Sequence, residues 1–267
     1  MNSSSVDPRS VEARPVEPQS VEAQSVEARS VEAGFVDRTP AGPSSGSPGP
    51  GSRTPSSAAM AEAARAALAA SPVVAVVRAP RIPDAAALCA ALAEGGITWT
   101  EFTFTTPDVT THLHRAAQAG HRVGVGTVLN AQQAEQGLTA GASFLVTPGL
   151  RPEVAEVAHA AGVPVILGAL TATEVAQAVD LGAAAVKIFP ARAFGPGYFK
   201  DLRGPYPDVP LVASGGVNAG NAAEFLAHGA LAVCAGTDVV PPEVVAAGDW
   251  AEITRRARAF TEACALQ

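Results

Sequence analysis

The chain has 267 residues, of which 48% are hydrophobic, and a formal net charge of −7. This length suits one domain of roughly 200–250 residues with a full core. The acidic balance and the lack of a basic patch argue against a nucleic acid partner, and no apolar run approaches the ~20 residues that span a membrane. The three scattered cysteines, without a CxxC pair, indicate reduced thiols in a cytoplasmic protein (Cys89, Cys234, Cys264).

We expect residues 1–59 to be disordered. They begin with a five-residue repeat (SVDPR, SVEAR, PVEPQ, SVEAQ), and a Pro/Gly/Ser-rich stretch follows. One valine in five residues fits neither the helical nor the strand period, so the repeat builds no core face. Met60 directly precedes the first predicted helix, which raises the hypothesis that translation begins there. The alternative is a partner-binding tail, and the intact mass of the native protein would distinguish the two.

From residue 60 to residue 267 the sequence alternates apolar strands with Ala-rich or amphipathic helices. The predicted strands are 73–77, 97–105, 123–128, 144–147, 164–167, 184–189, 210–213 and 231–236. The predicted helices are 61–70, 84–93 with Asp84 as N-cap, 109–119, 131–139, one from Pro152, 172–181, 197–202, 218–228 and 250–262.

Eight strand–helix units in about 200 residues predict a (β/α)8 TIM barrel behind a disordered tail. Most strands are continuous apolar runs, as expected when both faces are buried. A doubly wound open sheet is the alternative, but no GxGxxG follows the first strand.

Lys187 is the first candidate catalytic residue. The chain has 18 basic residues but only two lysines, Lys187 and Lys200, and Lys187 lies inside an apolar strand. Burial disfavours the ammonium form, and a neutral amine is a nucleophile, whereas arginine stays protonated. We therefore expect Lys187 to form a Schiff base with a ketone substrate. The alternative is a buried stem with an amine that reaches solvent.

Glu101 is the second candidate, because it is an acid inside a largely apolar strand. Glu101, Thr103 and Thr105 share one face of that strand, which we expect to be the barrel lumen. A carboxylate near Lys187 could move protons during the reaction. The alternative is a structural ion pair with an arginine.

Glycine-rich loops follow the last two strands, SGGVN at 214–218 and AGTD at 235–238. Loops at these places commonly bind phosphate, because glycine lets backbone N–H groups approach the anion. Arg78, at the end of the first strand, would add a positive charge beside the last strand. The alternative is a pair of ordinary strand–helix turns. His112 and His114 face different sides of one helix, so we expect no metal site there.

These motifs together resemble those of the 2-keto-3-deoxy-6-phosphogluconate and 2-keto-3-deoxy-6-phosphogalactonate aldolases. The matching segments are EFTFTTP (101–107), VGTVLN (125–130), VTPGL (146–150), VKIFPARAFG (186–195) and SGGVN (214–218). The resemblance implies a class I aldolase with a (β/α)8 fold, usually a homotrimer, that uses no metal or other cofactor. Its partner would be a phosphorylated 2-keto sugar acid.

By the same resemblance, Lys187 would be the Schiff-base lysine and Glu101 the general acid/base. Thr127 and Pro148 would line the pyruvate pocket, with Phe189 beside the imine. The distal phosphate would be held by Arg78 and the glycine-rich loops (Ser214, Gly215, Gly216, Gly236, Thr237).

One position departs from the gluconate pattern. Thr105 stands where those enzymes carry an arginine for the pyruvate carboxylate, and it favours the galactonate form. Arg151 and Arg192 are possible substitutes. The predicted function is cleavage of the 6-phosphogluconate substrate, with the galactonate epimer or 4-hydroxy-2-oxoglutarate as alternatives. A phosphate-binding barrel isomerase and an inactive scaffold are the other hypotheses.

Overall fold

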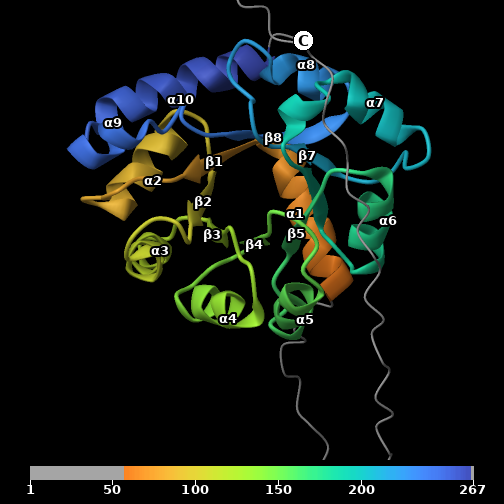
Figure 1. Ribbon diagram of the computed structural model, residues 1–267. Coiled ribbons are helices and arrows are strands. Elements are labelled where there is room, and N and C mark those ends of the chain that lie inside the picture. The colour runs from red at the N-terminus through yellow and green to blue at the C-terminus, as the bar shows by residue number, and fades with distance from the viewer. Residues whose placement is uncertain (1–56, 266–267) are drawn as a thin grey trace, which may run out of the picture. The chain divides into compact units, whose positions relative to one another are not determined.

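The computed structural model describes residues 57–265, so nearly all of the predicted disordered tail lies outside the described residues. In this part of the chain, eight parallel strands form one closed barrel in the order β1 to β8 (Figure 1). Helices follow the strands around its outside. The predicted (β/α)8 fold is therefore confirmed, and the open-sheet alternative is excluded.

The strands of the barrel are short and lie close to the predicted positions. They are β1 (Val73–Val77), β2 (Trp99–Thr103), β3 (Val123–Gly126), β4 (Leu145–Val146), β5 (Val165–Ala169), β6 (Ala185–Ile188), β7 (Leu211–Ala213) and β8 (Ala230–Ala235). The first half of the helices comprises α1 (Ser57–Ala70), α2 (Ala85–Glu94), α3 (Val109–Gln118), α4 (Ala131–Thr139) and α5 (Pro152–Ala160). The second half comprises α6 (Ala172–Asp180), η1 (Ala191–Ala193), α7 (Gly197–Arg203), α8 (Ala222–Ala227), α9 (Pro242–Ala247) and α10 (Trp250–Ala265).

Local sequence signals explain several of these bounds. The Asp84 side chain accepts a hydrogen bond from Ala87 N at 3.0 Å, as expected of the N-cap of α2. The helix predicted at 218–228 begins only at Ala222. In the turn before it, the side-chain oxygen of Asn218 accepts from Gly220 N, and that of Asn221 accepts from Asn218 N. These side chains compete with helical hydrogen bonding, so the turn persists.

The helices α1 and α9 also differ from the prediction. α1 begins at Ser57, so the folded domain starts three residues before the predicted residue 60. α9 was not predicted. It is one short helix between Pro241 and Gly248, and Gly248 ends it with a φ of 72°. Six residues are too few for a helical period to be read from the sequence.

A separate inner core fills the amino-terminal half of the barrel interior. It is built from inward-facing strand residues (Val74, Trp99, Phe144, Val146, Ile166, Ala185, Val212, Ala232, Cys234). The rings of Trp99 and Phe144 are 4.9 Å apart. Gly124 makes room for this packing, because a Cβ there would lie 2.4 Å from the Phe144 ring.

α1 closes the amino-terminal end of the barrel. Ala64 and Leu68 belong to the inner core, and Arg65 Nε donates to the carbonyl of Ala184 at 2.8 Å, immediately before β6. Figure 1 shows α1, in orange, crossing beside the barrel strands. With this end filled, the space for a ligand lies at the other end of the strands.

Candidate active site

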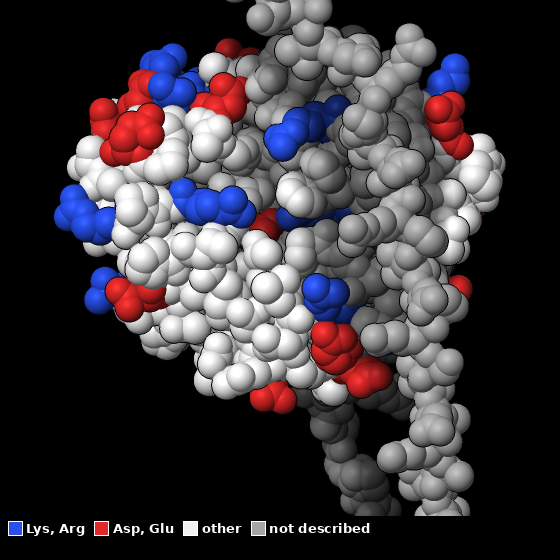
Figure 2. Space-filling view, in the orientation of Figure 1, with Lys and Arg blue, Asp and Glu red and all other residues white. Residues whose placement is uncertain are grey.

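A pocket of about 860 Å³ opens at the carboxyl ends of the strands. Figure 2 shows this hollow near the centre of the face, with acidic and basic side chains inside it. The predicted catalytic and substrate-binding residues line the pocket, with the exception of Arg151 (Arg78, Glu101, Thr105, Thr127, Pro148, Lys187, Phe189, Ser214, Gly215, Gly216, Gly236, Thr237). The barrel therefore brings together residues that lie up to 159 positions apart, from Arg78 to Thr237.

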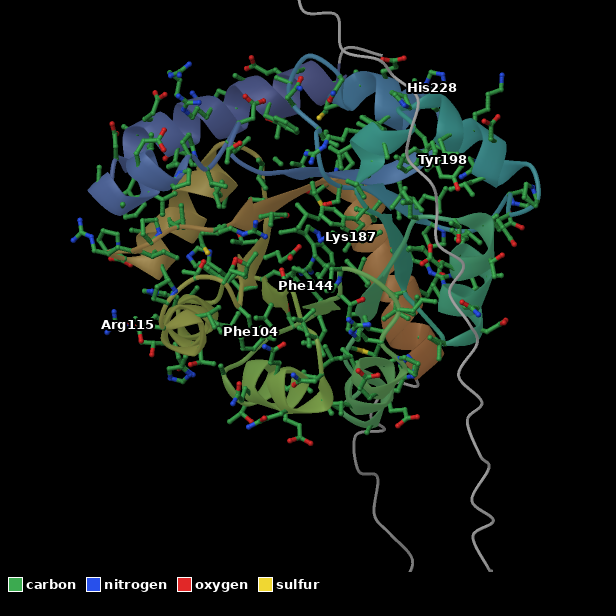
Figure 3. The ribbon with its side chains drawn as sticks, in the orientation of Figure 1. Phe104, Arg115, Phe144, Lys187, Tyr198 and His228 are labelled. Carbon is green, nitrogen blue, oxygen red and sulfur yellow. The ribbon has the colours of Figure 1, made fainter. Side chains whose placement is uncertain are left out.

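Lys187 reaches the floor of the pocket from β6. It lies between Gly168 of β5 and Val212 of β7, and its exposed fraction is 8%. Figure 3 shows its side chain near the centre of the barrel, whereas Arg115 and His228 lie at the periphery. The amine therefore points into the lumen, and the alternative of an amine that reaches bulk water is wrong. The other lysine, Lys200, is exposed on α7.

Glu101 faces Lys187 across the lumen. Its Oε2 lies 3.7 Å from Lys187 Nζ, and the residue is 1% exposed. Among the described residues, this Oε2 has no hydrogen-bond partner. A buried oxygen that accepts no hydrogen bond lowers the stability of the fold, so a residue with a purely structural role would rarely leave one. The arrangement suits a carboxylate that exchanges a proton with a bound molecule.

Glycine at position 126 provides the space for this carboxylate. Gly126 lies in β3 beside β2, and a Cβ there would be 1.9 Å from Glu101 Oε1. No real Cβ tolerates such a distance, so the glycine is a steric requirement of the observed Glu101 position.

A chain of hydroxyl groups extends from β2 to the rim of the pocket. The Thr103 hydroxyl lies 3.1 Å from the carbonyl of Val77 and 2.9 Å from the Thr105 hydroxyl. Thr105 lines the pocket together with Glu101, as the shared strand face predicts. Thr103 is fully buried and holds Thr105 to β1.

The glycine-rich end of the pocket lies at β7, β8 and β1. Gly215 and Gly216 have φ angles of 88° and 86°, in the region that favours glycine. β1 pairs with β8, which puts Arg78 near Gly236 as expected. Arg192 also lines the pocket at this end. It packs against Gly216, where an added Cβ would lie 2.6 Å from the Arg192 Cβ.

Arg151 does not line the pocket, although it was considered with Arg192. It precedes α5, and its guanidinium donates to the carbonyl of its neighbour Leu150 at 2.9 Å. Of the two arginines, Arg192 alone reaches the site, and it lies at the glycine-rich end.

Among the lining residues to which the sequence analysis gave no role are Cys234 and Asp238, the latter at the end of the predicted AGTD loop. Cys234 occupies an inward position of β8, and burial raises the pKa of its thiol to about 11. The alternation of side chains along β8 could have found it. Asp238 follows the strand by three residues, where no periodic signal applies. Within residues 57–265, no group of three or more His, Cys, Asp and Glu residues is placed to hold a metal ion.

The comparisons with known proteins agree with this geometry. The family model for KDPG and KHG aldolases matches residues 64–256. The chain belongs to this family. It is therefore a carbon–carbon lyase of the aldolase class, as the motifs predict.

Individual members of the KDPG and KHG aldolase family match over most of the barrel. The 2-dehydro-3-deoxy-phosphogluconate aldolase of Treponema pallidum is 39% identical over 185 residues, which cover 68% of this chain and 88% of that protein. The KHG/KDPG aldolase of Escherichia coli is 32% identical over 202 residues, with coverages of 74% and 95%. The solved KDPG aldolase of Legionella pneumophila, with pyruvate captured as a covalent carbinolamine, is 31% identical and has a TM-score of 0.69. That alignment covers 73% of this chain and 97% of the Legionella chain.

Proposed function

We propose that this protein is a Schiff-base aldolase that cleaves 2-keto-3-deoxy-6-phosphogluconate to pyruvate and glyceraldehyde 3-phosphate, with Lys187 and Glu101 as its catalytic residues. The observation that carries the proposal is the buried pair of Lys187 Nζ and Glu101 Oε2, 3.7 Å apart in a pocket at the carboxyl ends of the strands. An amine is required because a guanidinium cannot form the imine.

In the proposed mechanism, the Lys187 amine attacks the C2 ketone to give a carbinolamine, which loses water to form a protonated imine. The imine accepts the electron pair of the C3–C4 bond as Glu101 takes the proton of the C4 hydroxyl. Glyceraldehyde 3-phosphate leaves, and the remaining enamine takes up a proton at C3. Water then adds to the imine and releases pyruvate, which regenerates the free amine.

The two ends of the pocket suit the two ends of this substrate. Thr127 and Pro148 would contact the pyruvate moiety, and Phe189 lies beside the amine, with its ring centroid 5.7 Å from Lys187 Nζ. The distal phosphate would bind at the glycine-rich end, where open backbone N–H groups and the charge of Arg78 favour an anion. Ser214, Gly215, Gly216, Gly236 and Thr237 form this end.

Thr105 is the residue that raises the question of substrate preference between the 6-phosphogluconate and 6-phosphogalactonate epimers. It presents a neutral hydroxyl at the rim of the pocket, in place of an arginine. This observation favours the 6-phosphogalactonate substrate as a second candidate, and Thr127 and backbone N–H groups would then hold the carboxylate. Measurement of kcat/KM for the two epimers, and for 4-hydroxy-2-oxoglutarate, would rank the three substrates.

Borohydride trapping with pyruvate tests the catalytic lysine. We expect a covalent adduct at Lys187 in the parent protein and none in Lys187→Arg, whose turnover should be abolished. Lys200→Arg is the matched control, since Lys200 is exposed on α7, and it should behave as the parent does. Circular dichroism would confirm that both variants are folded.

An absent adduct in the folded parent would contradict the proposal and would leave the isomerase and the inactive scaffold. Cleavage assays with the phosphorylated sugar acids would then separate those two hypotheses.

We also infer a homotrimer that acts in the cytoplasm. The family resemblance supports the trimer, and the scattered, reduced cysteines support the location. In the described part of the chain, no helix has the length and apolar character needed to cross a membrane. Light scattering should give the mass of three protomers, and a monomeric mass would contradict the assembly.

A further inference from the structure

Asp238 is a carboxylate in the pocket for which the proposed mechanism has no use. It is half-buried after β8 and lines the glycine-rich end with Gly216 and Thr237. In the described part of the chain it forms no ion pair with a basic side chain. A negative charge at this place would repel a phosphate. Its presence therefore calls for a role that depends on hydrogen bonding.

The side chain of Asp238 connects two neighbouring loops. Its Oδ2 accepts a hydrogen bond from Ala219 N at 2.8 Å, and Ala219 belongs to the loop between β7 and α8. Among residues 57–265, no other hydrogen bond links 216–221 to a different strand–helix unit. Asp238 is thus the hydrogen-bonded tie between this loop and the turn after β8.

The loop itself is held together by its own side chains. Asn221 Nδ2 donates to the carbonyl of Gly216 at 3.0 Å, and Asn221 Oδ1 accepts from Asn218 N at 2.8 Å. Asn218 Oδ1 accepts from Gly220 N at 2.9 Å. The start of the loop is held from the segment after β6, because Ala191 N donates to the carbonyl of Ser214 at 2.7 Å and Arg192 N to that of Gly215 at 3.0 Å. The bond from Ala219 to Asp238 holds the far end of the loop, and the internal bonds of Asn221 connect that end to Gly216.

The turn that carries Asp238 is itself held by hydrogen bonds to neighbouring parts of the barrel. The carbonyl of Gly236 accepts from Val239 N at 3.0 Å and from Val240 N at 2.9 Å. The carbonyl of Asp238 accepts from Arg256 Nη1 at 3.2 Å, and Arg256 Nε lies 2.7 Å from Glu252 Oε1 on α10. The carboxylate is therefore presented to Ala219 from a fixed turn.

We infer that Asp238 is a positioning residue for the distal phosphate, which acts by holding the loop 214–221 so that the backbone N–H groups of Gly215, Gly216 and Val217 face the anion. The other N–H groups of this loop donate to protein acceptors. This inference rests on the proposed function, because it assumes a phosphorylated substrate in this pocket. It assigns the hydrogen-bond acceptor, and not the negative charge, as the useful property of Asp238.

Two substitutions separate the acceptor from the charge. Asp238→Ala removes both, and we expect KM for the phosphorylated substrate to rise about three- to tenfold, as the loss of one hydrogen bond predicts, with kcat unchanged. Asp238→Asn keeps an oxygen that can accept from Ala219 N, and KM should stay at the parent value or fall below it. Inhibition by inorganic phosphate should weaken in Asp238→Ala alone. Asp208→Ala, which removes an exposed acid elsewhere, should match the parent.

Pyruvate provides a readout that does not involve phosphate. The pyruvate concentration that half-saturates borohydride trapping should be the same in the parent and in both Asp238 variants. Weaker pyruvate trapping in Asp238→Ala would show a general structural defect and overturn the inference. An unchanged KM in Asp238→Ala, or an Asp238→Asn variant as impaired as the alanine variant, would overturn it too. Failure of the proposed function is distinct, since the parent itself would then neither trap pyruvate nor cleave the substrate.

Discussion

At the scale of single residues, the position of Glu101 depends on the absence of a side chain at Gly126. The Glu101 carboxylate fills the space where a Cβ on residue 126 would stand, 1.9 Å from Oε1. From there its Oε2 lies within 4 Å of Lys187 Nζ. The distance between the two proposed catalytic groups is thus set from a third strand, β3.

Gly126→Ala should displace the Glu101 carboxylate and lower kcat by about tenfold or more, because general acid/base catalysis contributes about 10²–10⁴ in rate. Lys187 should still be trapped by pyruvate and borohydride, since imine formation needs the amine. Steady-state kinetics and trapping would measure the two effects separately.

Gly124→Ala is the matched control for this change, because its Cβ would meet the Phe144 ring in the inner core instead of Glu101. It should lower the free energy of unfolding by about 1–3 kcal/mol and leave kcat nearly unchanged. An equal loss of kcat in the two variants would contradict the specific role of Gly126.

Much of the site could be predicted from the sequence, because the ends of parallel strands converge in a barrel. Lys187 and Glu101 stood out as charged residues in apolar strands, and both lie in the pocket. Asp238 and Arg151 show the limit of this reasoning. Which loop residues face the pocket depends on the path of each loop, and loops have no period from which to read it.

At the scale of elements, the eight strands were predictable because most of them are short apolar runs between helices. The prediction fails where side-chain hydrogen bonds interrupt a helical pattern, or where a helix is too short to show one. Asn218 and Asn221 shorten α8 by holding a turn, and α9 has only six residues. The inner core could not be separated from the outer core by sequence, since both are apolar.

The helix α1 offers a test at this scale. Leu68 is 1% exposed and packs in the inner core at the closed end of the barrel. Leu68→Ala should lower the free energy of unfolding by about 2–5 kcal/mol, because it leaves a cavity. Denaturant unfolding would measure this.

The control is the same substitution at Leu129, which is 43% exposed, and its effect should be below about 1 kcal/mol. Similar effects at both positions would contradict the packing role of α1. A chain that began at Met60 would retain Ala64 and Leu68, and so both contacts with the inner core.

At the scale of the whole molecule, three buried thiols couple folding to alkaline pH. Burial raises the pKa of Cys89 to about 12 and the pKa values of Cys234 and Cys264 to about 11, from an ordinary value of 9.0. Above pH 9 the unfolded chain releases these protons, whereas the folded chain retains them. The contribution to stability is therefore complete below pH 9 and is lost as the pH rises toward 11–12.

Denaturant unfolding of the parent between pH 8 and pH 10.5 should show this decline. A variant with all three cysteines replaced by alanine should show a shallower decline over the same range, even though its stability at pH 8 is lower. Equal slopes for the two proteins would mean that other groups cause the alkaline loss.

The closed end of the barrel has a consequence for the order of events in the proposed reaction. Because α1 and the inner core fill the amino-terminal end of the barrel, substrate and products must all pass through the pocket opening at the carboxyl ends of the strands. In the proposed mechanism the aldehyde leaves through this opening first, while the three-carbon enamine is still bonded to Lys187. An excess of this aldehyde would re-enter the pocket and accept the electron pair of the enamine before C3 is protonated, so the proposed reaction should be reversed toward C3–C4 bond formation when this product accumulates.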